Sequence, residues 1–219
     1  MSDYLSHCLK RTLIAGLLAC VSHLACAAPD LPPLNGVKQF AFKIGERGPG
    51  GGFIFFVDYF DQYPGFTYLE VAPTDASANV WCDQTTTSIP GAAGWDANAV
   101  GRGRANTNAM LAVCSSGAAN DADNYSTAST NPGDWFLPSE AEANLLYTNL
   151  RQAGVGGNAD TIVGVGGFDD TVGDFTDDLY WSSTEASDRF SAWCESFNGR
   201  SLFSFFKGSK LRVRAVRAF

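Results

Sequence analysis

Histidine is almost absent from the chain, and the only two, His7 and His23, lie within its first 27 residues. We expect those residues to be removed as an export signal. A chain cut after Ala27 would contain no imidazole, which Ser-His-Asp triads, Cys-His pairs, His-ligated zinc sites and histidine general bases all require. The sequence therefore predicts a protein that is not an enzyme, with no catalytic residues, no metal and no cofactor.

Positive charge is also scarce. The chain has 15 Lys and Arg against 23 Asp and Glu, for a formal net charge of −8. Proteins that bind nucleic acid neutralise phosphates with Lys and Arg. We therefore expect no nucleic-acid partner.

No apolar run is long enough to cross a membrane, since a spanning helix needs about 20 apolar residues. The longest candidate, TLIAGLLACV at 12–21, follows Lys10-Arg11 and precedes small residues, which is the order of a secretory signal. Lys10-Arg11 also resembles a weakened twin-arginine signal. Two processing routes remain open: cleavage after Ala27, or attachment of a lipid at Cys20 or the less well matched Cys26.

The expected organisation follows from this signal. Residues 28–39 are Pro-rich and lack periodicity, which is typical of a tether. We expect a signal peptide or lipoprotein signal at 1–27, the tether at 28–39 and one folded domain at 40–219. The protein would be exported, either to the cell surface as an outer-membrane lipoprotein or as a secreted chain, and would touch a membrane only through the lipid.

Only three of the six cysteines belong to the predicted domain, and an odd number leaves one unpaired. Cys82 and Cys114 enclose a segment rich in Gly, Thr, Asn and Ala, where a disulfide would stabilise the fold by roughly 3–4 kcal/mol. We expect that disulfide and a free Cys194. The alternative is that all three are small buried apolar side chains.

Short strands are predicted at both ends of the domain, and those at the C-terminal end lie at 179–184, around Trp193 and Phe197, and at 212–219. FIFFV at 53–57 is a continuous aromatic and β-branched run that fits a strand buried on both faces, and residues 67–72 are the expected neighbour. Residues 73–103 are loop-like, with Trp81 and Trp95 as apolar anchors. Gly48–Gly52 predicts a turn before the strand and not a phosphate-binding loop.

Two helices are predicted. One would be capped by Asn106 or Thr107 and run to about Val113. The other begins with the capping-box pair Ser139 and Glu142 and ends at Gly154. Its apolar stripe comprises Ala143, Leu146, Tyr147 and Leu150. The fold class is therefore α+β, with mostly antiparallel short strands, two helices and long loops.

Five motifs occur in order along the chain: GPGGGFIFFV, GRANTNAMLAVC, DWFLPSEAEANLLY, YWSSTEA and the terminal RVRAVRAF. Over roughly residues 44–219 they resemble the C-terminal domain family of bacterial collagen-like adhesins. That resemblance implies a C-type-lectin-like fold, related to formylglycine-generating enzymes, at a cell surface. Enzymatic activity of that kind needs a reactive cysteine pair, whereas the pair expected here is structural.

The segment 181–219 resembles the variable region of proteins diversified by retroelements, in which Asn codons are rewritten at their adenines. Trp193, Glu195, Lys207 and Lys210 cannot arise from such codons and would be fixed. The resemblance implies a ligand-binding set that comprises Ala186, Ser187, Asp188, Arg189, Phe190, Ser191, Cys194, Ser196, Arg200, Leu202, Phe203, Ser204, Phe205, Phe206, Gly208, Ser209 and Leu211. Its ligand would be an unidentified protein or glycan at a cell surface.

Residues 200–206 have apolar side chains at both odd and even positions, which fits either a strand buried on both faces or an irregular exposed loop. The flanking Arg200, Lys207 and Lys210 favour exposure. We therefore expect an irregular loop that holds Phe203, Phe205 and Phe206 in solvent.

Two sets of charged residues in the C-terminal part of the chain can each be interpreted in two ways. The first comprises Arg212, Arg214 and Arg217 in an expected closing strand, and we expect them to pair with carboxylates. In the alternative, a fixed-specificity adhesin or lectin, they would join Arg189, Arg200, Lys207 and Lys210 in a patch that binds anionic, sulfated polysaccharide. The second group lacks EF-hand spacing and predicts a solvated acidic loop and not a calcium site; it comprises Asp169, Asp170, Asp174, Asp177 and Asp178.

Overall fold

Two separate β-sheets organise the part of the chain that the computed structural model describes, residues 39–151 and 174–219. The smaller sheet has the order β1 (Phe53–Val57), β2 (Tyr68–Val71), β8 (Val216–Ala218). The larger has the order β3 (Ala76–Asn79), β7 (Leu211–Val213), β4 (Leu179–Glu185), β5 (Ser191–Ser196), β6 (Ser201–Phe206). Neighbours are antiparallel except β4 and β7, which run parallel.

Four α-helices lie in the described residues, where two were predicted: α1 (Trp95–Asn98), α2 (Gly103–Leu111), α3 (Ala118–Asp123) and α4 (Glu140–Leu146). A 3₁₀-helix, η1 (Pro90–Ala92), precedes α1, and a π-helix, η2 (Tyr147–Arg151), continues α4. The α+β class with mostly antiparallel strands is confirmed. The missed helices are one or two turns long, too short to show a helical period.

The predicted cap of the first helix is wrong, because α2 begins at Gly103, before Asn106 and Thr107. Both side chains instead bond distant backbone from inside the helix. Asn106 donates to the Ala97 carbonyl (2.7 Å), and Thr107 accepts from the Leu137 N–H (3.0 Å). Such partners are 9 and 30 residues away, so local sequence does not reveal them.

The capping box of α4 is confirmed. The Ser139 hydroxyl accepts from the Glu142 N–H (3.2 Å), and the Glu142 carboxylate accepts from the Ser139 N–H (2.8 Å). The predicted apolar stripe is buried along α4 and η2. Its expected end at Gly154 lies outside the described residues.

β1 and β2 pair as predicted, and the glycine before β1 permits their close approach. A Cβ atom on Gly52 would lie 1.9 Å from the Val71 carbonyl oxygen, so no other residue fits there. Gly50 and Gly52 donate their N–H groups to the buried Glu70 carboxylate (3.1 and 2.7 Å). The segment is thus a turn fastened to β2, as the sequence predicted.

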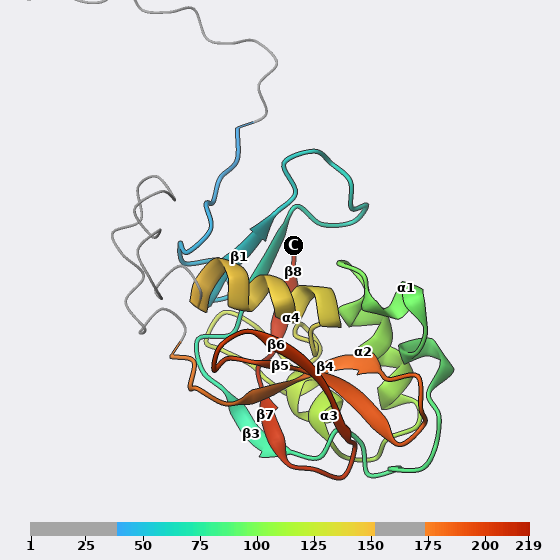
Figure 1. The fold of residues 1–219 in the computed structure, drawn as a ribbon. Coiled ribbons are helices and arrows are strands. Elements are labelled where there is room, and N and C mark those ends of the chain that lie inside the picture. The colour runs from blue at the N-terminus through green and yellow to red at the C-terminus, as the bar shows by residue number, and fades with distance from the viewer. Residues whose placement is uncertain (1–38, 152–173) are drawn as a thin grey trace, which may run out of the picture. The chain divides into compact units, whose positions relative to one another are not determined.

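Helix α4 lies between the small sheet and strands β4 and β5, while α1, α2 and α3 gather on another side (Figure 1). One apolar cluster surrounds Trp81, Trp135 and Trp181, and a second joins Phe55, Leu146, Tyr180 and Phe197 across the two sheets. Trp81 is buried as expected. The same prediction for Trp95 is wrong, since its side chain is 86% exposed.

None of the helices in the described ranges has the length and hydrophobicity to cross a membrane.

Candidate functional site

Strand β6 is exposed along its whole length. All six residues of Ser201–Phe206 are exposed, and Phe203, Phe205 and Phe206 are 44%, 38% and 52% accessible. The prediction that this cluster faces solvent is confirmed. The prediction of an irregular loop is wrong, because β6 pairs with β5 over six consecutive positions, from Ser191 opposite Phe206 to Ser196 opposite Ser201.

The edge position of β6 explains this combination of regular structure and exposure. Lys207 donates its N–H to the Phe190 carbonyl (2.9 Å). In an antiparallel edge strand, the backbone N–H and C=O groups of one residue bond the partner strand and those of the next residue point away from it. Leu202 and Ser204 therefore turn their backbone N–H and C=O groups outward. Their side chains also lie on the opposite face from Phe203 and Phe205, so both faces of the strand offer apolar surface.

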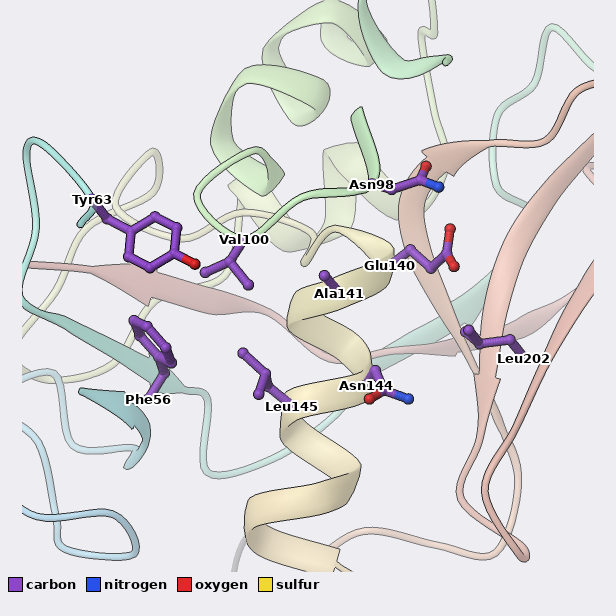
Figure 2. Close-up of a pocket in the computed structure, with 9 residues that line it drawn as sticks. All are labelled: Phe56, Tyr63, Asn98, Val100, Glu140, Ala141, Asn144, Leu145 and Leu202. Carbon is purple, nitrogen blue, oxygen red and sulfur yellow. The ribbon is translucent and has the colours of Figure 1, made fainter. Parts of the chain in front are cut away.

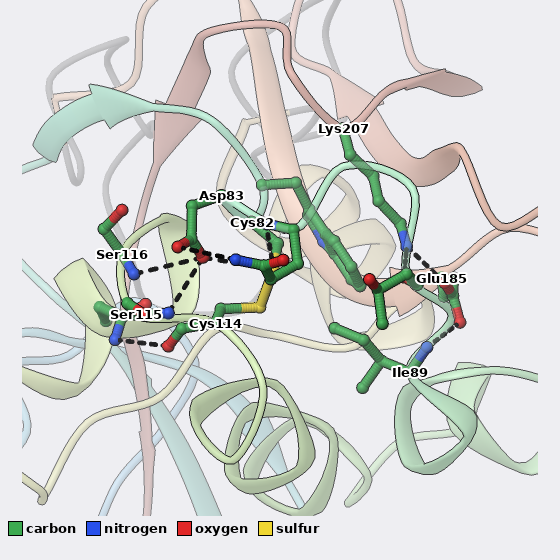
Figure 3. The surroundings of a disulfide bond; sticks show 12 residues. Cys82, Asp83, Ile89, Cys114, Ser115, Ser116, Glu185 and Lys207 are labelled. Carbon is green, nitrogen blue, oxygen red and sulfur yellow. Dashed lines mark hydrogen bonds and ion pairs between the residues drawn. A yellow bond between two sulfur atoms is a disulfide. The ribbon is translucent and has the colours of Figure 1, made fainter.

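The end of β6 is fixed by a buried ion pair. The Lys207 ammonium is fully buried, contacts the Glu185 carboxylate, donates to the Thr87 carbonyl (2.9 Å) and lies 4.7 Å from the centre of the Trp81 ring. Glu185 also accepts from the Ile89 N–H (2.9 Å). Figure 3 shows this pair near the Cys82–Cys114 disulfide, which is confirmed. Lys207 therefore anchors the strand and does not face a ligand.

Most of the expected ligand-binding set reaches the surface. The exposed members are Ser187, Asp188, Arg189, Phe190, Arg200, Leu202, Phe203, Ser204, Phe205 and Phe206, and the half-buried ones are Ser191, Gly208, Ser209 and Leu211. They lie in the β4–β5, β5–β6 and β6–β7 turns, on β6, and at the first residues of β5 and β7. Ala186, Cys194 and Ser196 are buried, so we leave these three out of the surface.

Cys194 is free, as predicted, but its side chain is fully buried. It lies on β5 opposite Trp181 and Phe203, and its thiol contacts the Phe203 carbonyl (3.5 Å). Burial, with a smaller contribution from the Glu195 charge, raises the pKa of the thiol to about 12. Cys194, which the sequence placed in the variable ligand-binding set, is therefore a core residue.

The arginines near the C-terminus pair with carboxylates. Arg212 contacts Asp75 and Asp178, Arg214 contacts Asp75, and Arg217 contacts Glu70. The expected single closing strand is instead β7 and β8, one in each sheet. These contacts, with the burial of Lys207, remove four members from the alternative anionic-ligand patch.

The acidic segment offers no metal cluster within the described residues. Asp177 pairs with Arg151 and Asp178 with Arg212, while Asp169 and Asp170 lie outside the described ranges. Among the described residues the one group close enough to suggest a metal is Cys82, Asp83 and Cys114. Its two sulfur atoms are bonded to each other and cannot be thiolate ligands.

Two hollows flank the exposed surface. The larger, of about 490 Å³, lies over α4 and is lined by Phe56, Tyr63, Asn98, Val100, Glu140, Ala141, Asn144, Leu145 and Leu202 (Figure 2). The smaller, of about 270 Å³, is lined by Gly94, Trp95, Asn98, Glu185, Ser187 and Trp193. Asn98 lines both. Each includes one residue of the expected set, Leu202 or Ser187.

Sequence reasoning missed most of these lining residues. Trp95 was expected to be buried, and Glu140 carried no signal beyond its place at the start of a helix. Phe56 and Tyr63 come from segments that approach α4 only in the folded chain.

No protein-family model matches the chain, and no curated protein matches it significantly.

Proposed function

We propose that the protein is a non-enzymatic, surface-displayed ligand-binding protein whose binding face is formed by β6 and by the β4–β5, β5–β6 and β6–β7 turns. A C-type-lectin-like scaffold would hold this face, and a retroelement would diversify it. The ligand would be a protein or glycan at a cell surface.

The distribution of exposed apolar side chains carries the proposal. Of nine large apolar side chains exposed in the described residues, five lie between 190 and 206: Phe190, Leu202, Phe203, Phe205 and Phe206. Concentrated exposed apolar surface is typical of binding sites. Each aromatic anchor could contribute about 1.5–3 kcal/mol when a ligand buries it.

The backbone at Arg200 supports diversification from an Asn codon. Its φ is 54°, a left-handed conformation that Asn adopts several-fold more readily than most residues. Position 200 follows Gly199, which also has positive φ, in the β5–β6 turn. An original Asn at this turn, replaced by rewriting, accounts for an Arg where Arg is disfavoured.

The alternative, a fixed-specificity lectin for sulfated polysaccharide, has less support. Four of its seven basic residues are engaged in ion pairs with Asp75, Asp178, Glu70 or Glu185. Salt dependence of glycan binding would favour it, because exposed charge pairs are screened.

Sequencing the gene from sister isolates tests the proposal. We expect substitutions to concentrate at the exposed positions between 187 and 211 and to spare Trp193, Glu195 and Lys207. Flanking DNA should contain a near-identical template repeat and a reverse transcriptase. Substitutions spread evenly over the gene would contradict the proposal.

The proposed location at the cell surface has a separate test. Protease added to intact cells should digest the domain, and fatty-acid labelling of Cys20→Ala and Cys26→Ala variants should show which cysteine, if either, is lipidated. Protection of the domain from protease in intact cells would contradict surface display.

A further inference from the structure

The outer edge of β6 presents a row of backbone groups without a partner strand. β6 ends the larger sheet, and its neighbour in the described residues is β5 alone. The backbone of Leu202 and Ser204 turns away from β5, and so does that of Phe206, two residues further on. Within the described turns and loops, the one backbone hydrogen bond to this row runs from the Ser209 N–H to the Phe206 carbonyl (2.8 Å). The edge therefore offers three N–H groups and two C=O groups.

This row has the period of an extended polypeptide. Its groups recur at every second residue, about 7 Å apart, and an added strand presents its own N–H and C=O groups at the same spacing. The hydroxyl groups of a glycan do not alternate in this way. Exposed apolar side chains stand on both sides of the edge, with Leu202 and Phe206 on one face of β6 and Phe203 and Phe205 on the other. They can pack against alternate side chains of the added strand.

Charge at the two ends of β6 indicates which strand fits. The exposed Arg200 precedes β6, and the exposed Arg189 and Lys210 lie in the two turns that meet at its other end. The acidic residue of those turns, Asp188, accepts a backbone N–H of its own turn (2.9 Å). A second copy of the chain is disfavoured, because either orientation of two β6 strands places like charges beside each other. A strand with acidic ends meets opposite charge in both orientations.

We propose that this edge binds an extended polypeptide segment that has apolar residues at alternate positions and an acidic residue at each end. The segment adds to the larger sheet as a further strand beside β6, a mode in which main-chain hydrogen bonds supply affinity and side chains supply specificity. The site rests on the proposed function, because the edge belongs to the same face, and it identifies the ligand as a polypeptide. Rewriting the side chains of β6 would change the specificity and leave the backbone bonds in place.

Titration of the full-length protein with the capped peptide Asp-Val-Thr-Val-Thr-Val-Glu tests the backbone contacts. Two derivatives carry N-methyl groups, one on every Val and the other on every Thr, so each lacks the donors of one edge of the peptide. We expect one derivative to bind about tenfold or more weakly, because it loses at least two hydrogen bonds, and the other to bind within about twofold of the parent. A peptide with Lys at both ends should bind more weakly than the parent, because its charges are repelled.

Three results of this titration would overturn the proposal. They are no binding of the parent peptide, equal affinity of the two N-methyl derivatives, and a Lys-ended peptide that binds as tightly as the parent.

Ser204→Pro tests the same contacts from the side of the protein. Proline is tolerated in an edge strand where its nitrogen faces solvent, so pairing with β5 should persist while one outward N–H is lost. Ser204→Ala is the matched control, since it also removes the hydroxyl but keeps the N–H. The parent peptide should bind about tenfold more weakly to Ser204→Pro than to Ser204→Ala. Thermal unfolding checks that both variants fold, and the N-methyl derivatives decide the matter if Ser204→Pro does not.

Two outcomes of these variants would contradict the proposal. One is a folded Ser204→Pro variant that binds the peptide as tightly as Ser204→Ala. The other is a dimer of the free protein, detected by sedimentation, that Ser204→Pro abolishes, because the edge would then be occupied by a second copy.

Failure of this site differs from failure of the proposed function. Equal peptide binding by the two variants, together with substitutions concentrated at the exposed positions in sister isolates, would leave a diversified face that recognises its ligand through side chains alone. Substitutions spread over the whole gene, together with peptide binding that Ser204→Pro weakens, would contradict diversification and retain the added strand.

Discussion

Arg214 illustrates how individual buried charges hold this fold. Its guanidinium is 1% exposed, pairs with Asp75, donates to the carbonyls of Ala72 and Asp174 (3.0 Å each) and lies 4.2 Å from the centre of the Phe175 ring. A buried charge is tolerated only when it is paired and hydrogen-bonded in this way. Arg214 therefore belongs to the scaffold between the two sheets.

Cys194 gives a prediction at the scale of one atom. Because the pKa of its thiol is raised to about 12, almost no thiolate exists at pH 8, and burial blocks access. Iodoacetamide should leave Cys194 unmodified in the native protein and alkylate it once the chain is unfolded in guanidinium, as mass spectrometry would show. Rapid alkylation of the folded protein would contradict this placement.

Glu142 gives a pH dependence. Its carboxyl is fully buried, and although it accepts the N–H groups of Ser139 and Gly101, desolvation raises its pKa from 4.5 to about 7. Between these values the folded state binds more protons than the unfolded chain. The free energy of unfolding should therefore fall as the pH rises from about 4.5 to 7, measured by urea denaturation at each pH.

The matched variant for this dependence is Glu142→Gln. It should be less stable at every pH, since one acceptor of the capping box is lost, but its stability should decline less steeply over the same range. Glu140 and Glu195 contribute in the same direction, so a residual slope remains. A slope as steep as that of the unsubstituted protein would show that Glu142 is not the group involved.

At the scale of the element, β6 is a regular strand whose far end depends on Lys207. Replacing Lys207 with Met leaves Glu185 buried without its cation, which should lower the free energy of unfolding by about 3–5 kcal/mol. Adding Glu185→Gln should recover part of that loss, because the uncompensated charge is gone. Chemical denaturation measures both.

Lys210→Met is the control, since Lys210 is exposed and such substitutions usually stay within about ±0.5 kcal/mol. If Lys207→Met behaved like Lys210→Met, the buried ion pair would not hold the end of β6.

The elements differ in how well the sequence predicts them. β1 and α4 could be predicted because FIFFV and the Ser139–Glu142 box act locally. The strand character of β6 could not be predicted. Both of its faces are exposed, so its apolar and polar side chains do not alternate in the way that indicates a strand with one buried face. Its order comes from pairing with β5 and from Lys207, whose partners Thr87 and Glu185 lie 120 and 22 residues away.

The site shows the same division. Exposure of Phe203, Phe205 and Phe206 followed from their charged flanks, whereas burial of Cys194 depends on contacts across the sheet. The groove over α4 could not be predicted, because Phe56, Glu140 and Leu202 meet only in the folded chain.

At the scale of the whole molecule, three apolar clusters in the described residues and several buried ion pairs hold the fold, and they support a surface that contributes little to stability. The clusters around Trp135 and Leu146 hold the sheets and α4 together. The surface formed by β6 and its flanking turns lies outside all three clusters. Side chains there can therefore change while the fold is retained, which a diversified binding face requires.

Thermal unfolding of a variant with Ser at Phe203, Phe205 and Phe206 tests this central claim most directly. Cross-strand pairs contribute roughly 0.2–1 kcal/mol each, so the three changes together should lower stability less than Trp135→Ala alone, which should cost about 3–5 kcal/mol. The account predicts a folded triple variant with a cooperative transition. If the three aromatics were core residues, their combined loss would exceed the roughly 5–15 kcal/mol of an ordinary domain's stability in most cases. A triple variant that is unfolded at 25 °C, beside a Trp135→Ala variant that still folds, would contradict the account.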